Sequence, residues 1–530
     1  LTEHWDDVSG EQLDGEMVDK AREEELEEFR KHQVYEKVPI KECWENTGKA
    51  PIGTRWIDIN KGDKDKPEYR SRLVAQDIKR DKRDDLFAAT PPLEAKKLLF
   101  AIVASSGSRP FKPFKIDFID VRRAYFHARA RRLVYVKLPP EDDEEGMCGR
   151  LQQAMYGTRD AAQNWEMAYT EFLETIGFKS SLVNPCVFFH EVQGLYLVVH
   201  GDDFTIAGTE EALDWFRGLI SGSMDVKFRA RLGPDVKDDK SVRILNRVVE
   251  WTNDGLRYEA DQRHAEIVVR DVGLKEGSKG VSTPGMKGKE GEVGDVEFDE
   301  SVYRSVAARG NYLAQDRPDL QYALKEVCRN MSKPTKDDWP LVKRVARYLL
   351  NSPRLVLNVR KQALPNKIIV WTDSDYAGCS ESRKSTSGGV VMLGNHCVKS
   401  WSTTQDIIAL SSGEAEYYAI VKGISQALGM KHMLHDLGID VSIVCKTDSS
   451  AAKSIASRRG CGRVRHIEVS TLWVQEKVAL GIVEMIKIPG TENLADILTK
   501  HVDRSTLDKH LSNMNIVRRE GRHDIMPNLA

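Results

Sequence analysis

The spacing of apolar residues changes along the chain and predicts several distinct regions. Residues 14–35 are charged and weakly amphipathic, which predicts a helix with a solvated face. From about Pro51 to Gly208, short apolar runs typical of strands alternate with helical patterns such as the one from Asp160 to Ile176. A second mixed region over residues 224–300 ends in a stretch rich in Gly, Lys and Glu, which predicts a linker. This mixture indicates an α+β architecture.

Helical spacing of apolar residues predicts helices over residues 301–360. Beyond Asn366 the pattern predicts three strands, a helix, a strand, a second helix, a strand and a final helix, which is typical of a compact α/β domain. The sequence from Ser411 to Glu414 predicts a capping box that opens the long helix, and Gly438 predicts its end. The expected strands are residues 368–372, 388–393, 397–401, 441–447 and 482–488.

Length and composition limit the classes of protein to consider. A chain of 530 residues is too long for one hydrophobic core and is expected to form roughly two to four domains. With 41% hydrophobic residues and no apolar run near the roughly 18 residues of a membrane span, the composition is that of a soluble globular protein. Its 8 cysteines are scattered without a Cys-x-x-Cys pair, which favours a reducing compartment. Because the chain begins with Leu1 and not Met, we expect a fragment of a longer protein.

The net charge of −2 indicates that any nucleic-acid binding must come from local basic patches. Ordinary surface charge balanced by acids explains each basic cluster equally well. The candidate clusters are Lys79-Arg80, Lys82-Arg83, Arg122-Arg123, Arg129 to Arg132 and Arg458 to Arg465.

Two adjacent carboxylates, Asp202 and Asp203, lie in the turn of a hairpin predicted by the segment VVHGDDFTIAG. Upstream, the segment FKPFKIDFIDVRRAYFHA predicts an alternating strand that ends at Asp120. Carboxylates brought together in this way repel one another, and a divalent cation such as Mg²⁺ removes that cost. Taken alone, the Asp pair is explained more often by the preference of Asp for turns.

A second set of acids lies at element ends of the predicted C-terminal domain. Asp373 ends its first strand, Glu416 lies one turn into the long helix, Asp448 ends the fourth strand and Asp496 opens the final helix. Four acids on one side of an α/β domain are what two-metal phosphodiester hydrolysis requires. Helix caps and turn acids explain each residue singly, but they do not explain the set.

The order of these segments resembles the reverse-transcriptase domain of copia-type retrotransposons. In that family a strand–Asp-x-x-x-Ala-aromatic motif precedes a Leu-Tyr-Gly…Trp helix and then a Tyr-x-Asp-Asp hairpin. DVRRAYF, MYGTRDAAQNW and HGDD occur here in that order. The resemblance implies that Asp120 and Asp202 bind the catalytic metals, with Asp203 as the second member of the pair.

The resemblance extends upstream and to the C-terminal region. TRWIDINKGDKDKPEYRSRLVAQ is similar to the family's fingers hairpin, which implies that Lys61 and Arg72 contact the incoming triphosphate and that Tyr125 is the steric gate against the ribose 2′-hydroxyl. Without the motif, solvated surface cations and a core aromatic explain these residues better. The segments that resemble the four catalytic motifs of copia-type ribonuclease H are WTDSDYAG, SSGEAEYYA, TDSSAA and PGTENLADILTK.

The resemblance implies an α+β polymerase with fingers, palm and thumb, a helical connection and a C-terminal α/β ribonuclease H-like domain. It implies an RNA-directed DNA polymerase with ribonuclease H activity, from an intracellular retrotransposon Pol polyprotein, in the cytoplasm (virus-like particle) or the nucleus. Mg²⁺ is the expected cofactor, with Mn²⁺ as the alternative, and the expected partners are an RNA template, a DNA primer, an RNA–DNA hybrid and dNTPs. The expected divisions are a lead-in helix over 1–35, fingers and palm over 36–222, a thumb-like region and linker over 223–300, a connection over 301–365, the ribonuclease H-like domain over 366–502 and a tail over 503–530.

Three residues depart from the family pattern. His200 and Gly201 stand before the Asp pair where the family has Tyr-x, and Asp160 stands where it usually has Gln. An acid near phosphates is repulsive, and Gly201 lacks a side chain to touch a primer end. Two alternatives therefore stay open: a catalytically inactive remnant that binds nucleic acid, and an enzyme with ribonuclease H activity alone.

Overall fold

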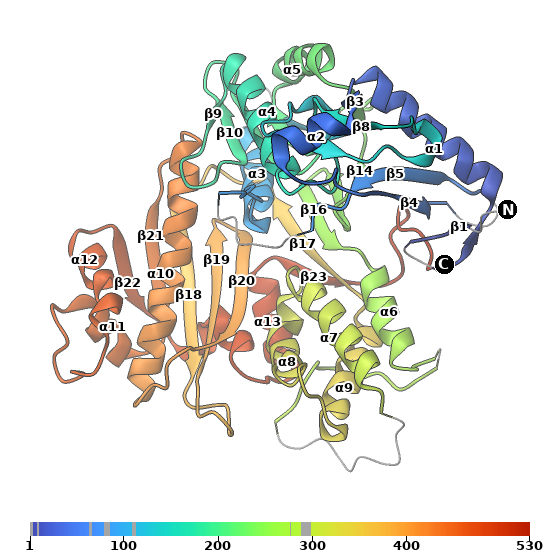
Figure 1. The fold of residues 1–530 in the computed structure, drawn as a ribbon. Helices are drawn as coiled ribbons and strands as arrows, with labels where there is room; N and C mark the ends of the chain where they lie inside the picture. Colours follow the sequence, from blue (N-terminus) through green and yellow to red (C-terminus); the bar gives the residue numbers. More distant parts are fainter. Residues whose placement is uncertain are drawn as a thin grey trace.

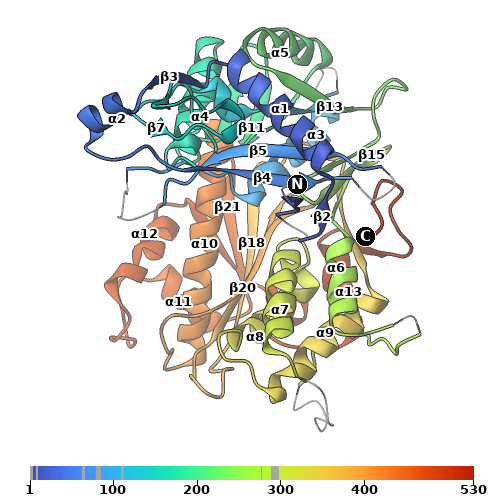
Figure 2. The same cartoon turned by 45° about the vertical axis from the view of Figure 1, so that its right-hand side comes forward.

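The computed structural model describes residues 4–7, 10–62, 66–78, 85–108, 113–275, 277–287 and 298–529. The basic clusters Lys79-Arg80 and Lys82-Arg83 lie outside these residues. Figure 1 shows the N-terminal elements in the upper part of the molecule, with the C-terminal α/β domain below them on one side and a group of helices on the other. Turning the molecule keeps this three-part arrangement in view (Figure 2).

The centre of the upper part is an antiparallel sheet of six strands. Its order is β13-β6-β12-β11-β10-β9, so the hairpin β11–β12 lies beside β6. The strands are β6 (Lys115–Val121), β9 (Lys179–Ser180), β10 (Val187–His190), β11 (Leu195–His200), β12 (Asp203–Gly208) and β13 (Val226–Leu232).

Helices cover both faces of this sheet. On one face, α4 (Ala161–Thr175) and α5 (Glu210–Ser223) pack on Ile119, Phe204 and other apolar residues. On the other face, α3 (Leu93–Ser105) packs against β11 and β12. Because side chains alternate along a strand, Asp120, His200 and Asp203 belong to the α3 face.

Besides the six-stranded sheet, the upper part contains three small sheets, formed mostly by residues that precede β6 in the sequence. The predicted lead-in helix is present, capped by the Asp14 side chain, which accepts a hydrogen bond from Met17 N. The elements are the pair β1 (His4–Trp5) and β2 (Gln12–Leu13), helices α1 (Gly15–Lys31) and α2 (Ile40–Thr47), the hairpin β4 (Thr54–Asn60) and β5 (Tyr69–Ala75), and the sheet of β3 (Tyr35–Pro39), β8 (Met147–Leu151) and β7 (Tyr135–Val136).

A five-stranded antiparallel sheet combines strands from distant parts of the sequence. Part of the segment 301–360 that was predicted helical is the strand β17, because Pro353 disfavours helix at the preceding residue and alternating Leu355, Leu357 and Val359 follow. In sheet order, the strands are β14 (Ser241–Ile244), β15 (Arg247–Thr252), β16 (Gly255–Ala260), β17 (Arg354–Arg360) and β23 (Ile516–Arg519).

Four helices lie between β16 and β17 in the sequence, and the last three of them confirm the helical prediction for residues 301 to about 351. They are α6 (Arg263–Asp271), α7 (Glu300–Ala314), α8 (Pro318–Arg329) and α9 (Trp339–Asn351). Short 3₁₀ helices in the chain are η1 (Ser106–Ser108), η2 (Ala124–His127), η3 (Pro140–Asp142), η4 (Lys336–Asp338), η5 (Val469–Thr471), η6 (Gly490–Glu492) and η7 (Leu494–Leu498). Among the described helices, none is both long enough and apolar enough to span a bilayer.

The C-terminal domain has the five predicted strands in the predicted order, but two helices and not one lie between the fourth strand and the fifth. Its sheet order is β20-β19-β18-β21-β22, with β18, β21 and β22 parallel. The strands are β18 (Lys367–Asp375), β19 (Thr386–Leu393), β20 (His396–Thr404), β21 (Ser442–Thr447) and β22 (Val483–Lys487), and the helices are α10 (Ser412–Asp436), α11 (Ser450–Ser457), α12 (Trp473–Ala479) and α13 (Arg504–Asn513).

Two local predictions for this domain need correction. The capping box of α10 is only half formed: Ser411 accepts from Glu414 N, but the Glu414 carboxylate accepts from Leu410 N and contacts His466 instead. Asp496 does not open the final helix, because it lies in the short η7. The final helix α13 begins later, where the Asp503 side chain accepts a hydrogen bond from Thr506 N.

A buried ion pair ties α8 to its surroundings. Arg317 and Asp319 are 1% and 4% exposed, and Arg317 Nη2 lies 2.7 Å from Asp319 Oδ2, which also accepts from the Tyr348 hydroxyl. Asp319→Ala leaves the guanidinium buried without its partner, so we expect a loss of about 3–5 kcal/mol in unfolding free energy, measured by calorimetry. Glu300→Ala, which removes an exposed pair with Arg304, should cost less than about 1 kcal/mol. Equal losses in the two variants would contradict this assignment.

Two candidate active sites

The hairpin β11–β12 places the predicted Asp pair beside β6. Asp203 is the pairing partner of Asp120 across β12 and β6, and Val121 N donates to Asp202 O at 2.9 Å. The turn needs glycine because Gly201 has φ +64°, a left-handed conformation that other residues rarely adopt. Trp165 Nε1 donates to Gly201 O at 2.8 Å and fixes the turn to α4. The Asp pair therefore lies beside Asp120 as predicted, but only Asp202 is in the turn, because Asp203 is already the first residue of β12 and pairs with His200.

The carboxylates of Asp202 and Asp203 are close together, and both have raised pKa values. Burial and the charge of Asp203 raise the pKa of Asp202. Burial also raises the pKa of Asp203, against the opposing charges of Lys96 and Arg229. Arg229 lies at a register shift in β13, and this bulge directs its Nη1 to 3.2 Å from Asp203 Oδ1. Protein cations thus offset part of the negative charge on the α3 face.

Lys61, Arg72 and Tyr125 lie within electrostatic reach of the same acids. Burial and the charges of Arg70 and Arg72 lower the pKa of Lys61, while the charge of Asp120 acts in the opposite direction. Burial and Asp202 raise the pKa of Tyr125, whose ring centroid lies 4.7 Å from that of Tyr156. The Arg72 guanidinium lies over the same Tyr156 ring at 4.9 Å. The hairpin β4–β5 therefore brings its cations to the Asp turn.

Asp160 does not behave as a free acid near a phosphate site. Its Oδ1 lies 2.9 Å from Arg132 Nε, and its Oδ2 accepts from Asn164 Nδ2 at 3.0 Å. The residue is 5% exposed. Its charge is therefore matched inside the protein, which weakens the repulsion expected from the sequence.

The second site lies at the carboxyl ends of the parallel strands β18 and β21. Asp373 belongs to β18, Asp448 follows β21, and Glu416 lies in the second turn of α10. One carboxylate oxygen from each residue lies within 4.8 Å of the other two. Neighbouring parallel strands end at the same edge of a sheet, which explains how residues far apart in sequence meet here.

The burial of this triad makes it a fitting site for a divalent cation. Burial, together with neighbouring acids, raises the pKa of Asp373 to about 7 and that of Glu416 to about 9, and raises that of Asp448. Ser374 N donates to Glu416 Oε1 at 3.1 Å, whereas the buried Glu416 Oε2 has no hydrogen-bond partner among the described residues. Clustered hard oxygen atoms with an unsatisfied lone pair are the ligands that Mg²⁺ prefers.

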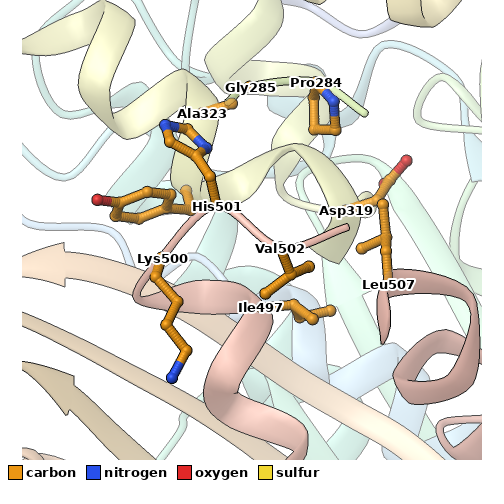
Figure 3. A pocket seen from close by; sticks show the side chains of 10 residues that line it. Pro284, Gly285, Asp319, Ala323, Ile497, Lys500, His501, Val502 and Leu507 are labelled. Atoms are coloured by element: carbon orange, nitrogen blue, oxygen red, sulfur yellow. The ribbon is translucent and has the colours of Figure 1, made fainter. Parts of the chain in front are cut away.

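Asp496 lies beside the triad but outside it. Its carboxylate forms an ion pair with Lys500, and its charge raises the pKa of Asp373 and of Asp448. The hydroxyl of Thr499 donates to Asp373. Figure 3 shows Lys500 and His501 projecting in opposite directions, so the segment after η7 places a cation toward the acids and an imidazole toward α8.

Residues 42–232 match a family model described as reverse transcriptase (RNA-dependent DNA polymerase). The chain is 26% identical over 521 residues to a retrovirus-related Pol polyprotein from transposon TNT 1-94 of Nicotiana tabacum, covering 92% of this chain and 37% of that protein. It is 30% identical over 229 residues to an uncharacterized mitochondrial protein of Arabidopsis thaliana, of which 90% is covered. The chain belongs to the reverse transcriptase family of retrotransposon Pol polyproteins.

This membership confirms the resemblance to copia-type Pol proteins. The Pol polyprotein from transposon RE2 of Arabidopsis thaliana is 26% identical over 88% of this chain. The chain spans only 37% and 32% of the two polyproteins. A foamy viral protease–reverse transcriptase solved with double-stranded DNA shares the polymerase fold, with a TM-score of 0.52 at 10% identity, covering 89% of this chain and 69% of that one.

Some residues of this reverse transcriptase family member were not predicted as site residues. Arg70 lies two positions before Arg72 on β5, so both side chains share one face of the strand, and the alternation in YRSRLVA could have indicated it. Lys500 is the last residue of the motif PGTENLADILTK, in which only Asp496 was predicted as a site residue. Lys96 and Arg229 carry no local sequence signal, because only the tertiary packing brings them to Asp203.

The triad predicts an unusual dependence of stability on pH. The pKa of Glu416 in the folded protein is about 9, above its value in the unfolded chain, so the folded state holds more protons. Without divalent cations, stability should therefore fall as the pH rises through the window up to about 9, and Glu416→Gln should remove part of that fall. At about pH 8 in a chelator, we expect the variant to be more stable by on the order of 2 kcal/mol, measured by calorimetry.

The exposed Glu484 of β22 provides the control for this measurement, since its only described ion pair is a surface contact with Lys367. Glu484→Gln should leave the pH dependence unchanged. A metal-free Glu416→Gln protein that is less stable than wild type at about pH 8 would show that repulsion does not dominate the triad.

Proposed function

We propose that this chain is an RNA-directed DNA polymerase with a ribonuclease H-like C-terminal domain, which copies a retrotransposon RNA into DNA. The observation that carries the proposal is the pairing of Asp120 with Asp203 beside the Asp202 turn, under a hairpin that carries Lys61 and Arg72. Family membership supports the polymerase activity. The partners would be an RNA template, a DNA primer and dNTPs, and then the RNA–DNA hybrid.

In this proposal the β4–β5 hairpin serves as fingers, the six-stranded sheet as palm, and the region from β14 to α6 as a thumb-like unit. Asp120 and Asp202 would hold Mg²⁺, or Mn²⁺, with Asp203 as the second member of the pair. When bound, the metal ions neutralise the charge that develops on the attacking and leaving oxygens. Lys61 and Arg72 would bind the triphosphate, and Tyr125 would exclude the 2′-hydroxyl.

In the C-terminal domain, Asp373, Glu416 and Asp448 would hold Mg²⁺ and Asp496 would complete the set. Lys500, paired with Asp496, would limit the negative charge before the metal arrives. The substrate would be the RNA strand of a hybrid, recognised by its shape and its 2′-hydroxyls.

One observation favours a second candidate, a protein that is a ribonuclease H alone. Among the described residues, a group of three acids within 4.8 Å is found at the C-terminal site and not at the Asp202 turn. At that turn Asp203 is engaged by Arg229.

Primer extension and hybrid cleavage, measured on one preparation with Mg²⁺ and with Mn²⁺, distinguish these functions. Incorporation of dNTPs on an RNA template supports the polymerase. Cleavage without extension supports the nuclease alone. A folded protein that binds a hybrid but performs neither reaction would refute both proposals and leave an inactive nucleic-acid-binding remnant.

A further inference from the structure

A cavity of about 300 Å³ lies behind the catalytic turn. It is lined by the start of α3, the end of β11, the turn between β14 and β15, and residues of β16 and α7. The side chains that matter for its chemistry are Lys96, His200, Arg247, Tyr258 and Tyr312. Of these residues, only His200 belongs to a motif of the sequence, as the first residue of HGDD.

Lys96 is the unusual member of this lining. The residue is 5% exposed, and its ammonium has no hydrogen-bond partner in the part of the chain that the structure describes. Burial lowers the pKa of Lys96 to about 8, and the charge of Asp203 opposes this shift. Asp203 already accepts a hydrogen bond from Arg229. The ammonium is therefore a buried donor that the protein itself does not satisfy, which is costly unless a ligand completes it.

The other strongly basic side chain among these, that of Arg247, has a carboxylate partner of its own. Arg247 is matched by Asp316, with Nε to Oδ2 at 2.8 Å, and also donates to Leu245 O and to the Tyr312 hydroxyl. The carboxylates near the cavity are already shared, Asp203 with Arg229 and Asp316 with Arg247 and Lys97, so within the part of the chain that the structure describes neither belongs to Lys96 alone.

We propose that this cavity is a phosphate-binding site whose buried cation is Lys96. The proposal rests on the proposed polymerase function for the source of the phosphate, since the cavity adjoins the Asp202–Asp203 turn. A lysine at the wall of a partly apolar pocket binds phosphate as a point charge. The phosphate comes either from the primer strand near its 3′ end or from a free anion such as pyrophosphate.

The first arm of the test uses free anions. Unfolding temperatures of the full chain are measured in a chelator with increasing inorganic phosphate or pyrophosphate. The anions should raise the unfolding temperatures of wild type and Lys96→Arg. The apparent affinity for the anion, obtained from the same titration, should be roughly tenfold or more lower in Lys96→Met. Lys41→Met, which removes an exposed lysine of α2, serves as the control. Because Lys96→Met removes an unsatisfied buried charge, it should fold at least as well as wild type.

The second arm uses a labelled primer–template in an equilibrium binding assay. Single methylphosphonate linkages are placed at each of the last positions of the primer. If the phosphate belongs to the primer, one linkage weakens binding to wild type and to Lys96→Arg but not to Lys96→Met. A response in the first arm alone identifies a free anion as the ligand.

Equal responses of wild type and Lys96→Met to both anions and to every linkage would overturn the proposal. Both arms measure binding and not incorporation. A failure of the polymerase proposal, seen as absent extension, is therefore distinguishable from a failure of the phosphate site.

Discussion

Asp202→Asn should lower the rate of primer extension by a factor of at least about 10³ and leave hybrid cleavage unchanged. The carboxylate at the turn is expected to hold the cation that neutralises the reacting phosphate, and a neutral amide cannot supply that charge. Asp202 is the natural choice because Asp203 is engaged by Arg229, whereas Asp202 lies within reach of Arg70 and Arg72 of the β4–β5 hairpin.

The substitution should not disturb the fold of the hairpin. The contacts that fix the turn are accepted by its main-chain oxygens: Val121 N donates to Asp202 O and Trp165 Nε1 donates to Gly201 O, and Asn at position 202 preserves both. Removing one of the crowded carboxylates should also relieve repulsion. A loss of extension can therefore be attributed to chemistry and not to unfolding.

Glu191→Gln is the matched control, because Glu191 is an exposed acid beside β10 of the same sheet whose ion pair with Lys179 is also exposed. It should extend primers like wild type. Extension that survives in Asp202→Asn at more than about a tenth of the wild-type rate would exclude this residue as a metal ligand.

Asp448→Asn should abolish cleavage of the RNA strand, again by a factor of at least about 10³, with extension retained. Its carboxylate is one of three whose oxygens lie within 4.8 Å, so one neutral member leaves the set short of charge for a cation. The start of α11 should survive, since its cap is the Ser449 side chain, which accepts from Ala452 N. Because the Asp448 site and the Asp202 turn are treated as distant and independent, a substitution at one site is expected to leave the activity of the other unchanged.

Asp440→Asn controls for this effect, because Asp440 lies shortly before β21 and is highly exposed, with a surface pair to His435. Cleavage should be unchanged in this control. If Asp448→Asn cleaves the hybrid normally, or if it loses extension instead, the assignment of separate chemistries to the two sites is wrong.

The sequence predicted the features that depend on local pattern. The β11–β12 hairpin, the strand that ends near Asp120 and the strands of the C-terminal domain are all present, because apolar alternation and turn residues specify them directly. Family motifs also indicated the three acids of the triad, in a predicted set of four whose last member, Asp496, lies beside the triad and not in it. Both kinds of information are contained in short segments.

The features that the sequence did not predict depend on packing or on competing local signals. Asp496 lies in η7 because Asn493 is held by a bond from its amide to Thr372 O, while the cap at Asp503 starts the helix later. The strand β17 was not predicted because its residues follow directly on a long segment with helical spacing of apolar residues, which was extended over them. Lys96 acts on the charge of Asp203 only because α3 packs against the hairpin, which no local sequence pattern indicates.

The five-stranded sheet has a consequence for how the molecule is made. Its strand β17 pairs on one side with β16 and on the other with β23, near residue 516. During synthesis on a ribosome, residues 354–360 emerge long before their second neighbour and present an unpaired edge. Closure of this sheet therefore waits for translation of the whole C-terminal domain, and the interval is when a chaperone would be most useful to this protein.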